Sequence, residues 1–166
     1  MKGDNEEMTQ KNSHIITAEP GGLAILMTRV FDAPRELVFK TCTDPNLIPQ
    51  WWGPEKFATT VEKMEMRKGG LWRFVQHGPD GGEYAFNGVY HECLSPERLV
   101  YTFEWEGMPG HVLLETVKFE EYEGKTKMAV TSVFQTVEDR DGMLKSGMEE
   151  GSVETWDRFA ELLTKV

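Results

Sequence analysis

The sequence contains no long hydrophobic run. Its longest purely apolar stretch covers residues 23–27, whereas a helix needs roughly 20 apolar residues to cross a bilayer. Residues 1–12 mix charged with polar side chains and lack the apolar segment of a secretory signal. We therefore predict a protein that is neither membrane-inserted nor exported, with a cytoplasmic location.

Cysteine is scarce. Cys42 and Cys93 are the only two, they form no CxxC pair, and no second ligand pair accompanies the lone His91-Glu92-Cys93. Disulfide scaffolds and zinc sites are both recognised in a sequence by the number and spacing of cysteines. The sequence therefore indicates a reducing compartment, and we expect no metal and no cofactor.

Positive charge is also in short supply. The chain has 18 Lys and Arg against 28 Asp and Glu, which gives a formal net charge of −10 at pH 7. Such a balance repels nucleic-acid phosphates and anionic lipid headgroups. We predict neither nucleic acid nor a membrane as a partner.

What is present suits one folded domain. The chain has 166 residues, of which 39% are hydrophobic, enough to bury a core without disulfides or metal. Residues 1–22 are polar, show no periodicity and end in Glu-Pro-Gly-Gly, so they are predicted to be a flexible leader. The domain is predicted to cover residues 23–166.

The order of patterns predicts the fold class. An apolar segment at 23–31 is typical of a strand, and Pro34 and Asp44 each indicate the start of a short helix. Alternation between residue 59 and about 136 predicts six or so further strands. Segment 139–166 then spaces its large apolar residues as one amphipathic helix does. This is an α+β domain, and we expect one curved antiparallel sheet wrapped around the C-terminal helix, with a cavity between them.

Several segments also resemble a known family. They are residues 29–39, 43–45, 51–54, 68–74, 77–81, 88–90, 96–100 and 151–159. Together they resemble the activator-of-heat-shock-protein-ninety-ATPase homology (AHSA-type) family, within the START-related helix-grip superfamily. Ser152 stands where the family's final helix usually has an aromatic residue.

The resemblance implies a helix-grip fold, in which about seven antiparallel strands grip a long C-terminal helix around a hydrophobic pocket. Its functional implication is broader. Members of the superfamily carry lipids, sterols or polyketides, some catalyse cyclisation or dehydration, and some bind proteins. Because one fold can host several activities, the fold does not indicate which of these this chain has.

Large aromatic side chains and methionines share one face of the predicted strands and helix. The strands contribute Met64, Met66, Trp72, Phe74, Tyr84, Phe86 and Tyr90, and the helix contributes Met143, Met148, Trp156 and Phe159. Such residues suit an adaptable apolar pocket, and they equally suit a solid core. Glu62 and Gln76 fall on the same face and are candidates for orienting a ligand. Of Trp51 and Trp52, at least one is expected in the core.

Three functional hypotheses follow. The first is a non-enzymatic carrier or sensor of a small hydrophobic molecule, since the chain has no nucleophile motif and no catalytic residue is assigned. The second is a stress-related co-chaperone-like module that binds a chaperone. A second copy of the chain is an alternative partner, through self-association. The third is a cyclase or dehydratase that uses an acid or base such as Glu62, His77, His91 or Tyr84.

Overall fold

The computed structural model describes residues 14–166 of the chain. These described residues form eight strands, three α-helices and one short 3₁₀ helix. In chain order these are β1 (Ile15–Thr17), β2 (Ala24–Phe31), α2 (Arg35–Thr43), η1 (Ile48–Gln50), β3 (Ala58–Met64), β4 (Leu71–His77), β5 (Glu83–Leu94), β6 (Arg98–Trp105), β7 (Leu113–Tyr122), β8 (Lys125–Val133), α3 (Val137–Lys145) and α4 (Met148–Leu163).

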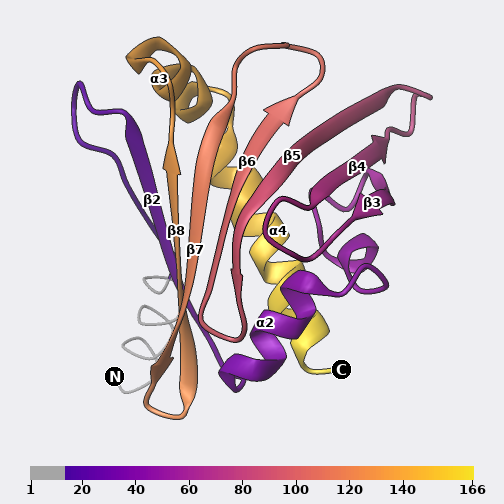
Figure 1. The fold of residues 1–166 in the computed structure, drawn as a ribbon, viewed down its shortest axis with the longest axis vertical. Coiled ribbons are helices and arrows are strands. Elements are labelled where there is room, and N and C mark those ends of the chain that lie inside the picture. Colours follow the sequence, from indigo (N-terminus) through magenta and orange to yellow (C-terminus); the bar gives the residue numbers. More distant parts are fainter. Residues whose placement is uncertain (1–13) are drawn as a thin grey trace, which may run out of the picture.

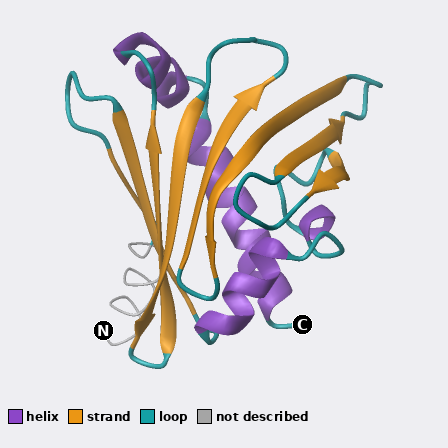
Figure 2. Ribbon diagram, in the orientation of Figure 1, coloured by secondary structure: helices purple, strands orange, loops and turns teal. Residues whose placement is uncertain are grey.

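All eight strands belong to one antiparallel sheet. Their order is β1-β2-β8-β7-β6-β5-β4-β3, so β1 and β3 are the two edge strands. The last strand of the chain, β8, pairs with β2. The sheet curves, and α4 runs diagonally across one of its faces (Figure 1). Figure 2 distinguishes the helices from the strands. Along the chain, α2 and η1 follow β2, the strands β3 to β8 come next, and α3 and α4 follow β8. The predicted α+β class with a single antiparallel sheet is confirmed.

The strand count differs from the predicted seven or so because part of the predicted leader joins the sheet. Residues Ile15–Thr17 form β1, an edge strand in which Ile16 pairs with Met27 of β2. A strand of three residues is too short to show a period-two pattern, so only its pairing reveals it. The rest of the predicted leader, residues 1–13, lies outside the described residues.

The predicted C-terminal helix is divided in two. Helix α3 ends at Lys145, Ser146 caps it, and α4 begins after Gly147. Gly147 has φ of 83°, a left-handed conformation that costs a glycine nothing but strains other residues. The prediction of one continuous helix from residue 139 was wrong. The spacing of apolar residues is the same in one helix and in two successive helices, so it does not reveal a break at a glycine.

The main core lies where α2 and η1 meet α4. Phe159 of α4 is completely buried, with its ring 5.0 Å from Phe31 and 4.9 Å from Trp51. Trp51 also stacks on Trp156 at 5.3 Å and donates its indole N–H to the carbonyl of Thr41 at 3.0 Å. The expectation that at least one of the tryptophan pair is core is confirmed by Trp51. This packing holds one end of α4 against the domain and leaves the other part of the helix to cover a cavity.

Candidate functional site

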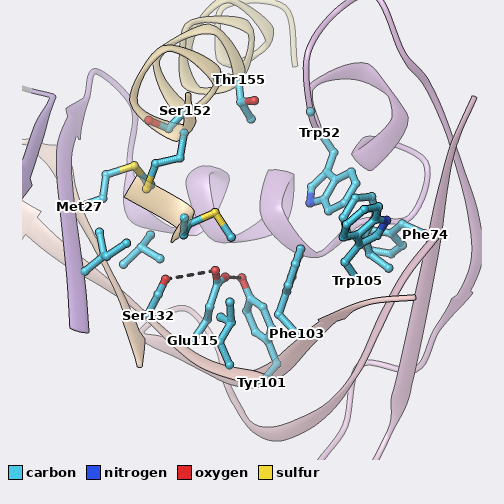
Figure 3. A pocket seen from close by; sticks show the side chains of 18 of the residues that line it. Met27, Trp52, Phe74, Tyr101, Phe103, Trp105, Glu115, Ser132, Ser152 and Thr155 are labelled. Atoms are coloured by element: carbon cyan, nitrogen blue, oxygen red, sulfur yellow. Dashed lines mark hydrogen bonds between the residues drawn. The ribbon is translucent and has the colours of Figure 1, made fainter. Parts of the chain in front are cut away.

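A cavity of about 790 Å³ lies between the concave face of the sheet and α4. Figure 3 shows its floor, formed by side chains of β6, β7 and β8, and its roof, where Ser152 and Thr155 project from α4. Apolar side chains dominate the lining, and the volume falls within the range of sites for small organic molecules. Trp105 and Met108, which are 37% and 48% exposed, mark its mouth.

Most of the residues predicted to bind a ligand line this cavity. They are Met64, Trp72, Phe74, Gln76, Phe86, Tyr90, Met143, Met148 and Trp156. The sheet curvature and the placement of α3 and α4 bring these residues together from segments far apart in the sequence. Their contact with a ligand stays a prediction.

Four predicted site residues do not line the cavity. Glu62 is exposed and forms an ion pair with Arg73, because a β-bulge between Val61 and Lys63 breaks the alternation that the prediction assumed. Phe159 is packed wholly inside the core. Tyr84 packs edge-on against Phe57, with ring centres 5.6 Å apart, and Met66 packs against the main core. Phe159 and Met66 therefore match the alternative of a solid core, whereas Glu62 lies at the surface.

A hydrogen-bonded group of three polar side chains, Tyr101, Glu115 and Ser132, lies on the cavity floor. Tyr101 donates its hydroxyl to Glu115 Oε2 at 2.6 Å, and Ser132 donates its hydroxyl to Glu115 Oε1 at 3.2 Å. Figure 3 shows both hydrogen bonds and the apolar side chains around them. The strand register sets this geometry, since Tyr101 of β6 and Ser132 of β8 both lie directly opposite Glu115 of β7.

Burial dominates the electrostatics of this group. Loss of water raises the pKa of Glu115 above its ordinary value, and the hydrogen bonds from Tyr101 and Ser132 lower it only in part. Burial, followed by the charge of Glu115, raises the pKa of Tyr101 well above its ordinary value, so its phenol stays protonated. Among the described residues, no Lys or Arg lines the cavity to offset the carboxylate.

The sequence interpretation missed this group, although one signal for it was available. Leu113, Glu115, Val117 and Phe119 alternate along one predicted strand, and this pattern places a carboxyl on an otherwise apolar face. Ser132 and Tyr101 carry no comparable signal, because polar or amphipathic residues at such positions are common. Only the register between strands brings them to Glu115.

Other polar groups line the cavity away from this group. Gln76 is predicted and observed there, with 7% of its surface exposed. His111 lies near the mouth with Nδ1 2.9 Å from Asp139 Oδ1. The residues proposed as acids or bases for an enzyme, Glu62, His77, His91 and Tyr84, do not meet there: none of them lines the cavity.

Within residues 14–166, no cluster of three or more His, Cys, Asp or Glu side chains is arranged to hold a metal ion. None of the helices in that range combines the length and apolar character needed to cross a bilayer.

The fold and cavity define a helix-grip domain with an internal apolar site. The chain belongs to the family described as Activator of Hsp90 ATPase homolog 1-like protein, whose model matches residues 32–164. No curated protein matches the chain. The family assignment therefore rests on the family model and on solved structures.

Two solved structures illustrate the likeness. A protein from Arthrobacter aurescens is 27% identical, with 92% of both chains covered and a TM-score of 0.83. A protein from Rhodobacter sphaeroides is 28% identical, with 91% of this chain and 99% of that chain covered and a TM-score of 0.84. The whole domain, rather than a local motif, is therefore shared.

A more distant structural likeness is to a protein of a biosynthetic locus. DynU16, a protein in the dynemicin biosynthetic locus, is 18% identical, with 86% of this chain and 47% of that chain covered and a TM-score of 0.65. At this identity the likeness shows a common fold.

Proposed function

We propose that this protein binds a small hydrophobic molecule, lipid-like or polyketide-like, in the cavity between the sheet and α4, without transforming it. The single observation that carries this proposal is the cavity itself, about 790 Å³ in volume and lined mainly by apolar and aromatic side chains. A well-packed core leaves few voids larger than a water molecule. A space of this size is therefore a site to be filled rather than a packing fault.

The composition of the lining supports the same function. Aromatic rings from β4, β5 and β6 form one wall of the cavity. The centre of the Trp72 ring lies 4.9 Å from that of Phe74 and 5.6 Å from that of Phe103. Methionines from α3 and α4 form part of the opposite side. Rings offer broad contact area and methionines adjust their shape, which suits a flat or flexible apolar ligand.

The experiment is a ligand screen with a matched pair of blocking variants. Lipids and aromatic polyketides are tested by thermal shift and native mass spectrometry. Polyketide-like molecules are included in the panel because DynU16, which has a similar fold, belongs to the dynemicin biosynthetic locus. Thr155→Trp fills the cavity from α4, whereas Val153→Trp adds the same side chain to a face of α4 that does not line it. A ligand at 100 times its Kd adds about 2.7 kcal/mol to stability.

We expect a one-to-one complex whose affinity falls about tenfold or more in Thr155→Trp and stays unchanged in Val153→Trp. Circular dichroism checks that both variants are folded. If nothing in the panel binds the wild-type chain, or if the folded Thr155→Trp variant binds as tightly as wild type, the proposal fails.

A second candidate is an enzyme of the cyclase or dehydratase kind. The observation that favours it is the raised pKa of Glu115 inside the cavity, because a carboxyl that keeps its proton can serve as a general acid. Turnover of polyketide substrates by wild type and Glu115→Gln tests this. Loss of about 100-fold in rate supports the enzyme, and equal rates in the two proteins exclude Glu115 as its acid.

A third candidate is a co-chaperone role in the stress response, which the family description favours. That description names an activator of the Hsp90 ATPase, and the match covers residues 32–164. The test is an ATPase assay of the chaperone with and without this chain. Stimulation supports the role, and an unchanged rate together with no co-purification rejects it.

A further inference from the structure

When Glu115 is ionised, the three polar side chains on the cavity floor, Tyr101, Glu115 and Ser132, present hydrogen-bond acceptors only. A hydroxyl has one proton to donate, and both Tyr101 and Ser132 donate theirs to Glu115. The lone pairs that remain free belong to the two hydroxyl oxygens and to the Glu115 carboxylate, which has about four acceptor positions in all. A ligand group that meets this floor must therefore be a donor.

The negative charge of Glu115 further restricts which ligand group can bind at the cavity floor. A carboxylate in an apolar cavity is costly unless a cation pairs with it. Among the residues that the structure describes, neither Lys nor Arg lines the cavity, and His111 lies near the mouth, where Asp139 engages its Nδ1. The lining residues that the structure describes thus provide Glu115 with two neutral donors and no lysine or arginine as a counter-charge.

We propose that the ligand of this cavity is a lipophilic amine, whose protonated nitrogen lies against Glu115, Tyr101 and Ser132 and whose apolar body fills the space below α4. An ammonium group brings several N–H donors and one positive charge, which complements an acceptor-only floor around a carboxylate. An anionic ligand such as a fatty acid would place a like charge beside Glu115. The proposal rests on the proposed ligand-binding function and specifies the class of ligand.

The test uses three probes with the same aromatic body: 2-(1-naphthyl)ethylamine, 2-(1-naphthyl)ethanol and 1-naphthylacetate. Their Kd values are measured by calorimetry at pH 7 on the full chain, on Glu115→Gln and on Glu138→Gln. Glu138 lines the same cavity from α3 but is exposed, so it is a control for the loss of one carboxylate. A charge-assisted hydrogen bond predicts that the amine binds wild type at least about tenfold more tightly than the alcohol, with the carboxylate weakest.

Glu115→Gln should bring the amine and alcohol affinities to within about threefold of each other, and Glu138→Gln should keep the wild-type preference. If the alcohol or the carboxylate binds wild type as tightly as the amine, or if Glu115→Gln keeps the preference, the amine inference is overturned while apolar binding stands. If none of the three probes binds while a lipid or polyketide of the panel does, the amine inference is overturned and the binding function stands; if neither the probes nor the panel binds, both are overturned. The wild-type series decides the inference by itself if Glu115→Gln does not fold.

Discussion

The hydroxyl of Tyr101 lies 2.6 Å from Oε2 of Glu115, and the two residues are directly opposite each other on β6 and β7. A one-residue shift in the register of these strands would send one of the two side chains to the other face of the sheet. The pairing also places a carboxyl where water is displaced by apolar side chains. Several measurable consequences follow from it.

The stability of the protein should depend on pH through Glu115. Its folded-state pKa is raised above the ordinary value of 4.5 by burial, so the folded chain holds this proton more tightly than the unfolded chain does. The resulting contribution to stability is complete below about pH 4.5 and is lost as pH rises through the raised folded-state pKa. We therefore expect the free energy of unfolding of wild type, relative to Glu115→Gln, to fall as pH increases. Urea titrations of both proteins between pH 4 and pH 8 measure this, and a difference that rises or stays flat would contradict it.

Removal of the Tyr101 hydroxyl should destabilise the fold at pH 7. Tyr101→Phe keeps the ring but takes a donor from a buried carboxyl, which costs about 1–3 kcal/mol. Ser132→Ala removes the longer bond of 3.2 Å, and we expect a smaller loss of about 0.5–1.5 kcal/mol. Denaturant unfolding measures both values, and a Tyr101→Phe variant as stable as wild type would show that this hydrogen bond does not stabilise the fold.

The contact of α4 with the core should be the most sensitive to truncation. Phe159→Ala removes a ring with no exposed surface and leaves a hole beside Phe31 and Trp51, at a cost of about 3–5 kcal/mol. Leu114→Ala is the control, because Leu114 is 40% exposed and its loss should cost less than about 1 kcal/mol. Thermal unfolding compares the two, and equal losses would mean that α4 is not anchored at Phe159.

Two glycines should respond in opposite directions to alanine. A Cβ at Gly88 would lie 1.8 Å from the carbonyl oxygen of Thr102, which accepts the indole N–H of Trp72, so Gly88→Ala should cost about 2 kcal/mol or more. A Cβ at Gly142, inside α3, meets nothing within 4 Å, and Gly142→Ala should add about 0.5–1 kcal/mol. Circular dichroism melts of the pair test this, and a stabilised Gly88→Ala would show that β5 and β6 are further apart than described.

Much of the candidate site could be predicted from alternation, and the failures have specific causes. Trp72, Phe74 and Gln76 lie at every second position of one strand, and all three line the cavity. Glu62 fails because a β-bulge adds a residue to its strand, which no propensity signals. Phe159 has ideal helical spacing but lies at the end of α4 that packs into the core, and the spacing is the same along the whole helix.

By itself the sequence determined the α+β class, the single antiparallel sheet and the family, because periodicity, turn residues and motifs are local properties of the chain. The tertiary structure decided the rest. The addition of β1 to the sheet, the break between α3 and α4 at Gly147, and the meeting of Tyr101, Glu115 and Ser132 all depend on which strands pair and in which register. Register is set by long-range packing across the whole sheet. That packing also decides that the Glu115 carboxyl lies on the floor of a cavity that no lysine or arginine of residues 14–166 lines.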